Sequence, residues 1–292
     1  MSKKMTKAMA EAFAAYGIKA DHKTNHIFCE PLNAWVPLML VDGNDKIGHG
    51  VWHFSTFPGT HAPKAEIIRK AFQIMGIDAD IDDAAIADCK GTCRCDCKDK
   101  DGNDTCYAKL GRYRMDSTNA PLVMRTYIAR RCMDWLERAI IAQIHVFGIT
   151  MCRVHASGDF FSNEYADMWV RIATACGACI FWTYTKTLFT SVSTFDSLQN
   201  ANVVKSFVPG RGLNYGHAGY IMQLYRELKA EGKSVWICKC GIDKEQHCNN
   251  CRHCFTAEYV LFLEHSTDYK PEKDPDFPAF VGLVKSQIEE AA

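Results

Sequence analysis

The chain has 292 residues, of which 48% are hydrophobic and 23% charged, so it can bury a core as one domain or two closely packed ones without disulfide staples. Its 34 basic and 34 acidic residues give zero formal net charge, which argues against a general electrostatic attraction to nucleic acid. No apolar run reaches the roughly 18 uncharged residues of a membrane span and no export signal opens the chain, so we expect a cytoplasmic protein without a membrane partner.

The expected elements begin with an amphipathic helix in residues 1–20, strand-like stretches at 36–41 and 51–57, and a helix over 63–75. A single long helix is expected over 119–147, where Arg125, Arg130, Arg131 and Arg138 form a solvated basic side. A strand at 149–156, a helix at 163–176 and a strand at 179–185 then make a βαβ unit, and 203–208, 216–230 and 235–238 continue the alternation. This pattern predicts parallel strands with crossover helices, closed into a partial TIM-like α/β barrel.

Three segments are expected to pack as one unit. Residues 1–60 supply the N-terminal helix and strands, 61–240 the barrel with a first cysteine-rich loop at 89–106, and 241–292 a C-terminal cysteine-rich segment with helices. No linker or internal repeat separates them.

Ten of the fifteen cysteines gather in two runs, which indicates metal or cluster ligation: Cys89, Cys93, Cys95, Cys97 and Cys106, then Cys238, Cys240, Cys248, Cys251 and Cys254. The repeated two-residue spacing of Cys248, Cys251 and Cys254 is typical of iron–sulfur sites, whereas zinc usually takes two separated ligand pairs. Cys238 or Cys240 can complete a four-thiolate set. The remaining Cys29, Cys132, Cys152, Cys176 and Cys179 are expected to be ordinary packed residues.

Polar residues follow the predicted strands, where the chemistry of parallel α/β folds is carried out. The first core strand ends in His155-Ala156-Ser157-Gly158-Asp159, the second in Tyr184-Thr185-Lys186 and the third in Pro209-Gly210-Arg211-Gly212. Strict alternation places Arg153, His155 and Ser157 on one face of the first strand.

Several segments resemble the phage gene product 88 family, over roughly residues 46–255. The matching pieces are Lys46-Ile47-Gly48-His49-Gly50-Val51 with Phe54-Ser55, Thr105-Cys106-Tyr107-Ala108 with Gly111-Arg112-Tyr113, His155 to Phe160 with Glu164-Tyr165 and Trp169, Tyr184-Thr185-Lys186, and Cys248, Cys251 and Cys254. Thr92-Cys93 takes the place of the family's Thr-Cys-Pro turn, with Arg94 where proline is usual. We take Cys93, Cys97 and Cys106 as the first ligand set, with Cys89 and Cys95 as alternatives to Cys97.

A looser resemblance is to radical S-adenosylmethionine enzymes, in which a Gly-Gly-Glu-like motif follows the second strand of a partial barrel. Ser157-Gly158-Asp159 takes a comparable place, so the resemblance implies that these residues bind S-adenosylmethionine, with Asp159 on its ammonium group and Lys186 or Arg211 on its carboxylate. Asp159, His155 and Lys186 are the candidate catalytic residues. The strict Cys-x3-Cys-x2-Cys spacing of that family is absent.

This reading implies one or two [4Fe-4S] clusters, the first with an iron open to S-adenosylmethionine and the second acting as an electron relay or substrate anchor. An electron donor of flavodoxin or ferredoxin type and a nucleotide or nucleic-acid substrate are the expected partners. Two alternatives are an iron–sulfur redox protein that does not use S-adenosylmethionine, and a zinc-stabilised nucleic-acid-binding module.

Overall fold

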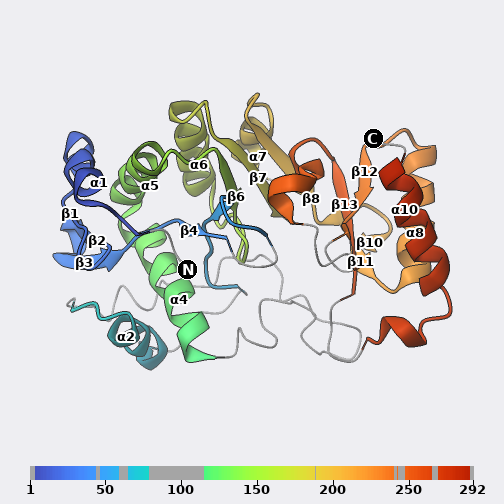
Figure 1. Ribbon diagram of the computed structural model, residues 1–292, viewed down its shortest axis with the longest axis horizontal. Coiled ribbons are helices and arrows are strands. Elements are labelled where there is room, and N and C mark those ends of the chain that lie inside the picture. The colour runs from blue at the N-terminus through green and yellow to red at the C-terminus, as the bar shows by residue number, and fades with distance from the viewer. Residues whose placement is uncertain are drawn as a thin grey trace.

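The centre of the computed structural model is a curled, mostly parallel sheet that forms a half-barrel within a mixed α/β fold (Figure 1). The structure describes residues 4–43, 47–58, 65–78, 115–187, 189–239, 242, 247–264 and 269–289. The first cysteine run and Cys240 lie outside these residues, so the predictions made for them stay predictions.

The strands of this sheet lie in the order β4, β5, β6, β7, β8, β13 and β11, and β12 also pairs with β13. Among the described strands of this sheet, all pairings are parallel except that of β4 with β5. The bounds are β4 Val41–Asp42, β5 Trp52–His53, β6 Met151–Val154, β7 Ile180–Thr185, β8 Ala201–Lys205, β11 Tyr215–Gly216, β12 Val235–Ile237 and β13 Tyr259–Leu263.

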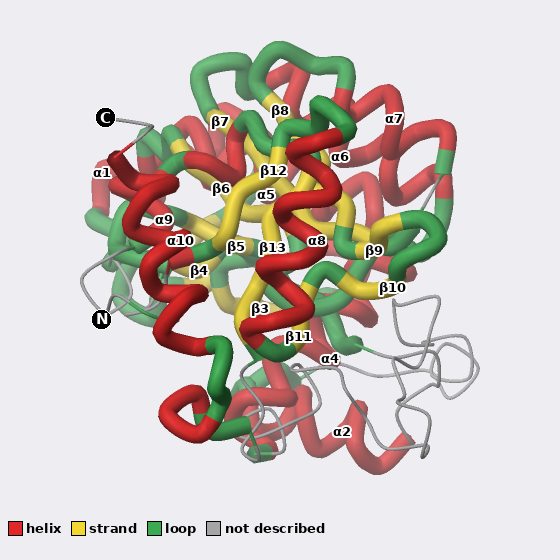
Figure 2. The backbone as a smooth tube through the Cα atoms, turned by 90° about the vertical axis from the view of Figure 1, so that its right-hand side faces the viewer, coloured by secondary structure: helices red, strands yellow, loops and turns green. Residues whose placement is uncertain are grey.

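Helices cover one face of the sheet. The helices α5 (Met133–Phe147), α6 (Asn163–Ala175) and α7 (Thr190–Asp196) bury apolar side chains against β5 to β8, in a core that includes Cys152, Phe181 and Val203. The helices α8 (Ala218–Ala230) and α10 (Phe277–Glu289) cover β12 and β13 in a second core (Figure 2). The side chain of Gln287 closes the edge of β12, because it accepts from the Ile237 amide and donates to the Ile237 carbonyl.

The N-terminal part packs beside α5. It consists of α1 (Lys7–Ala12), a 3-10 helix at Phe13–Tyr16, and a small antiparallel sheet of β1 (Ala20–Asp21), β2 (His26–Cys29) and β3 (Ala34–Pro37). Phe13 meets Phe147 edge to face, and the Trp135 indole donates to the Phe28 carbonyl. These contacts join the N-terminal residues to the same core as α5 and α6.

The helix expected over 119–147 is two helices, α4 (Asp116–Arg131) and α5, and α4 packs against α2 (Ala65–Ile74). The break is at Cys132, whose φ of −130° and ψ of 41° leave the helical region. Both helices bury an apolar face, and the helical spacing of apolar residues therefore continues through the junction. For this reason the sequence pattern did not reveal the break. Arg125, expected in solvent, is buried instead and donates from Nε to the Met39 carbonyl at 2.9 Å.

The strand β13 is missing from the expected alternation, although it lies between β8 and β12 in the sheet. Its sequence Tyr-Val-Leu-Phe-Leu is the continuous apolar run typical of a buried parallel strand. The helix α7 was also not expected. The residues after β8 form a hairpin of β9 (Phe207–Val208) and β10 (Gly212–Leu213), with Gly210 and Gly212 at positive φ.

In the described part of the chain, no helix is both long enough and apolar enough to cross a membrane.

Candidate functional site

The face of the half-barrel opposite the helices carries polar side chains at strand positions, and we call it the concave face. The guanidinium of Arg153 on β6 lies 4.8 Å from the ring centre of Tyr184 on β7. His53 on β5 is the register partner of Arg153, and burial, with the charges of Arg125 and Arg153, lowers its pKa to about 3. Parallel strands are usually apolar on both faces, so this row of polar residues marks the concave face as a candidate site.

Cysteines of the second run reach the concave face from three elements. Cys238 follows β12, Cys248 and Cys251 begin and end the short helix α9 (Cys248–Cys251), and Cys254 lies in the 3-10 helix His253–Phe255. Burial is the main cause that raises the pKa of the Cys254 thiol to about 12, and the neighbouring Cys248 and Cys251 add to the rise. The three cysteines at two-residue spacing therefore lie close enough in space for the charge of one thiolate to affect the pKa of another.

The sheet holds Cys254 at both its sulfur and its backbone. The Tyr184 hydroxyl and the Cys254 Sγ are hydrogen-bonded at 2.7 Å. Asn202 on β8 donates from Nδ2 to the carbonyls of Cys254, at 2.8 Å, and Ala257, at 3.0 Å. The turn that carries Cys254 is thus fixed to the middle of the half-barrel.

A loop from the other end of the sequence supports α9. The Nδ2 of Asn249 donates to the His49 carbonyl at 3.2 Å. Gly48 has a φ of 83°, and a Cβ there would lie 2.8 Å from the Asn249 side chain. Ile47 and Val51 belong to the same apolar cluster as Cys254. This gives residues 47–51 of the glycine-containing motif a structural role, since they pack against the helix of Cys248 and Cys251.

The surroundings of these cysteines are rich in donors and positive charge. Lys239 is only 7% exposed, and its Nζ lies 5.3 Å from the Trp236 ring centre. The His253 ring stacks on Trp236 at 3.4 Å between ring centres. Burial raises the pKa of Cys251, and the charge of Lys239 opposes that rise. No salt bridge among the described residues joins Lys239 to a carboxylate.

Four thiols in one neighbourhood fit a soft metal or an iron–sulfur cluster in the type of donor. As their side chains are placed, the described residues contain no group of three or more His, Cys, Asp and Glu arranged to hold a metal ion. Cys240, the alternative to Cys238, lies outside the described residues. A ligating thiolate is an anion that accepts hydrogen bonds. The charges of Lys239 and Arg153 and the hydroxyl of Tyr184 would stabilise such thiolates here.

Asp159 follows β6 and ties it to the end of β7. Its Oδ1 accepts from the Thr185 hydroxyl at 2.5 Å and from the Phe160 amide at 2.8 Å, and its Oδ2 accepts from the Lys186 amide at 3.0 Å. Burial raises the pKa of Asp159 to about 6, although these three bonds oppose the rise. Both carboxylate oxygens are thus engaged with the chain, and the predicted ammonium-binding role of Asp159 stays a prediction.

His155 leaves the strand alternation that was expected for it. Its φ of 60° turns the ring toward α6, where it is buried against Phe160 and Trp169 and its Nε2 is 2.9 Å from the Tyr165 hydroxyl. Arg153 instead covers Tyr184 on the concave face. The expectation that Arg153 and His155 share a face is therefore wrong. Burial lowers the pKa of His155 to about 3, so the ring is neutral at pH 7.

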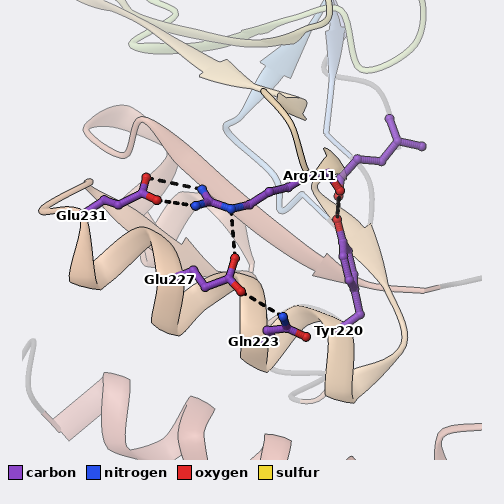
Figure 3. A network of polar contacts seen from close by, with 6 residues as sticks. Arg211, Tyr220, Gln223, Glu227 and Glu231 are labelled. Carbon is purple, nitrogen blue, oxygen red and sulfur yellow. Dashed lines mark hydrogen bonds and ion pairs between the residues drawn. The ribbon is translucent and has the colours of Figure 1, made fainter.

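The other residues predicted for S-adenosylmethionine are divided between two places. Ser157 is buried and donates from Oγ to the Thr56 carbonyl at 3.1 Å, and Gly158 has a φ of 87°. Lys186 is half-buried beside Asp159. Arg211 lies in the β9–β10 turn, where its guanidinium pairs with Glu227 at 2.9 Å and with Glu231 (Figure 3).

The sequence did not point to Asn202, Trp236 or Lys239. Arg153 and Tyr184 were within reach of the sequence, because parallel strands in register place Arg153 opposite Trp182, two residues before Tyr184 on the same face. Lys239 stands between two cysteines in the sequence, but its burial depends on the fold. The five cysteines expected to be ordinary packed residues are all buried, as predicted.

The fold and the site define an α/β half-barrel protein with a cysteine-bearing concave face. A family model described as Gene product 88 matches residues 60–209, just over half of the chain, and the protein belongs to this family. The match includes the first cysteine run and β6 to β8, whereas the motif at 46–51 and the second cysteine run lie outside it. Comparison with curated proteins and with solved structures found no match.

Proposed function

We propose that this protein binds iron–sulfur clusters and acts as a radical S-adenosylmethionine-like enzyme on a nucleotide or nucleic-acid substrate. The observation that carries the proposal is the convergence of Cys238, Cys248, Cys251 and Cys254, from three separate elements, on the concave face of a parallel half-barrel. A purely structural role for these thiols does not account for the buried Lys239, which has no carboxylate partner in the described part of the chain.

An iron–sulfur cluster, when bound, supplies one-electron transfer and, at an iron left open by three thiolates, a place for S-adenosylmethionine. In the proposal the second run holds a relay or anchor cluster through Cys248, Cys251, Cys254 and Cys238 or Cys240. The open cluster belongs to Cys93, Cys97 and Cys106, which lie outside the described residues. The substrate class rests on the family's association with phages and on no residue pattern in this chain.

For the cofactor carboxylate, the contacts favour Lys186 over Arg211. The Arg211 guanidinium is already paired with Glu227 and Glu231, and ligand binding would have to break these pairs. Lys186 directly follows β7 and lies next to Asp159. The proposal therefore places cofactor recognition at Ser157, Gly158, Asp159 and Lys186, with His155 as a buried neutral neighbour of this loop.

The test is electron paramagnetic resonance of the anaerobically purified, reduced protein before and after addition of S-adenosylmethionine. The proposal expects a cluster signal that the cofactor perturbs, with weaker binding in Lys186→Gln and unchanged binding in the matched control Arg211→Gln. A cluster signal that S-adenosylmethionine leaves unchanged would indicate an iron–sulfur redox protein that does not use this cofactor. Zinc without sulfide would favour a zinc-stabilised module instead.

A further inference from the structure

The thiols of Cys29 and Cys132 are hydrogen-bonded to each other where the N-terminal sheet meets the helix layer. Cys29 is the last residue of β2, and Cys132 is the break between α4 and α5. The Leu32 amide also donates to the Cys29 sulfur. Both cysteines belong to the same buried core, so two thiols from elements far apart in the sequence lie side by side.

One side of α5 fixes the backbone around this pair. Trp135 and Arg138 follow the N-terminal cysteine of α5 at intervals of three residues and so lie on the same side of the helix. The Trp135 indole donates to the Phe28 carbonyl at 3.1 Å, and the Arg138 guanidinium lies 3.9 Å from the Glu30 carboxylate. Phe28 and Glu30 are the chain neighbours of Cys29, so β2 is held against α5 on both sides of the thiol contact (Figure 1).

We propose that Cys29 and Cys132 form a modification site at which hydrogen peroxide oxidises the two thiols to a disulfide that joins β2 to the α4–α5 junction. Cys132 is the thiol that reacts with the peroxide, and Cys29 is the thiol that resolves the product. Neither residue belongs to the two cysteine runs, so the inference is independent of the proposed function.

The surroundings of the two thiols differ in a way that assigns these roles. The hydrogen bond from Cys29 and the charge of Arg131 lower the pKa of Cys132, whereas the hydrogen bond to Cys132 and burial raise the pKa of Cys29. Cys132 also stands at the N-terminus of α5, where the helix dipole favours a thiolate.

Access to the pair points to the same order and to a small oxidant. Cys132 is 5% exposed and follows the exposed Arg131, whereas Cys29 is fully buried. A protein disulfide is too large to reach either sulfur in the folded chain, but hydrogen peroxide is about the size of two water molecules. The reaction therefore begins at Cys132.

The reaction balances with one peroxide for each disulfide. The Cys132 thiolate attacks one peroxide oxygen, so that an S–O bond forms, the O–O bond breaks, and the leaving hydroxide takes up the proton that Cys132 released. The Cys29 thiol then attacks the sulfenic sulfur of Cys132. An S–S bond forms, the S–O bond breaks, and the hydroxyl leaves as water with the Cys29 proton. The two thiols lose two electrons, and the peroxide is reduced to two water molecules.

The experiment treats the folded, full-length wild type with hydrogen peroxide, blocks the remaining thiols with iodoacetamide, and digests the protein with trypsin in the absence of a reductant. Trypsin leaves Cys29 in the peptide 24–46 and Cys132 in the peptide 132–138, and neither peptide holds another cysteine. Cys29→Ser is treated in the same way. Cys152→Ser is the matched control, because Cys152 is a core cysteine whose pKa is raised by burial and by nearby cysteines, without a thiol hydrogen bond among the described residues.

The inference expects the two peptides to be joined in the oxidised wild type and in Cys152→Ser, at a mass about 2 Da below their sum, and to separate after treatment with dithiothreitol. In Cys29→Ser the reaction stops at a sulfenic acid on Cys132, which dimedone labels. The oxidised wild type also unfolds at a higher urea concentration than the reduced protein, because the disulfide closes a long loop.

Peptides that stay separate in the peroxide-treated wild type contradict the inference, as do peptides that join only after the protein is unfolded in urea. Loss of the Cys152 thiol before that of Cys132 contradicts it as well, since burial alone would then not protect a thiol. The wild-type digest decides the outcome even where Cys29→Ser does not fold. None of these results depends on iron content, so failure of this inference leaves the proposed function standing.

Discussion

Replacement of Asp159 by alanine tests the finding that this carboxylate ties the end of β6 to the end of β7. The change leaves three buried donors without their acceptor, namely the Thr185 hydroxyl and the amides of Phe160 and Lys186. Each unsatisfied buried donor costs about 1–3 kcal/mol, so the three together cost about 6 kcal/mol.

Removal of the buried charge offsets part of this loss. The pKa of Asp159 rises from 3.8 to about 6, and at 1.36 kcal/mol per unit the ionised form costs about 3 kcal/mol of folding free energy at neutral pH. Asp159→Ala should therefore lower the free energy of unfolding by about 3 kcal/mol. Asp159→Asn keeps an acceptor for Thr185 and Phe160 and loses the charge, so we expect it to stay within about 1 kcal/mol of the wild type.

The assay is urea unfolding at pH 7.5, followed by tryptophan fluorescence in the same metal-free buffer for all three proteins. If Asp159→Ala is as stable as the wild type, or if Asp159→Asn is the less stable variant, the carboxylate does not have the structural role derived from its contacts. If Asp159→Asn is stable but no longer binds S-adenosylmethionine, the same residue also serves the cofactor.

Three further changes test other parts of the structure. Because the folded pKa of Asp159 is raised, its contribution to stability is complete below about pH 3.8 and is lost as the pH rises through about 6. The unfolding free energy of the wild type relative to Asp159→Asn should therefore fall by about 2 kcal/mol between pH 4 and pH 7 in urea titrations, and a difference that does not change with pH would contradict the burial of this carboxyl. Gln143→Leu removes the partner of the buried Leu40 amide and carbonyl and should lower the free energy of unfolding in urea by about 2–4 kcal/mol. The control is Gln223→Leu at an exposed position, which should lower it by less than about 0.5 kcal/mol. Equal losses in the two variants would argue against the hydrogen bonds between Gln143 and Leu40. Gly48→Ala combines a positive φ with a clash against Asn249 and should cost about 2 kcal/mol, whereas Gly50→Ala has a similar φ and open space and should cost about 1 kcal/mol. Under the proposed function Gly48→Ala alone should also lower the iron content, and equal iron loss in both variants would mean that the clash with α9 does not matter.

The βαβ core could be predicted because hydrophobic pattern and chain punctuation agree there. The expected strands at 149–156 and 179–185 contain β6 and β7, and the expected helix at 163–176 contains α6, whose Ser162 cap accepts from the Tyr165 amide. The order of the last strands was not predictable in the same way. β13 passes between β8 and β12, and chain order alone does not show such an insertion.

The candidate site was predictable in its cysteines and less so in its other residues. Spacing identified Cys248, Cys251 and Cys254, but the contact of Cys254 with Tyr184 joins residues 70 positions apart. His155, one of the predicted site residues, has a left-handed backbone conformation that places its ring in the helix layer. Strand alternation assumes extended backbone at every position, so it fails where one residue leaves that conformation.

Whether the second cysteine run binds an iron–sulfur cluster is decided by the iron and acid-labile sulfide content per chain of anaerobically purified wild type, Cys251→Ala and Cys152→Ala. Cys152 is the matched control, because it is a buried cysteine in the core under the helices. With two four-iron clusters, we expect about eight irons per chain in the wild type, a loss of about half in Cys251→Ala, and no loss in Cys152→Ala. A wild type without iron and sulfide, or a Cys251→Ala variant that retains all of both, would contradict it.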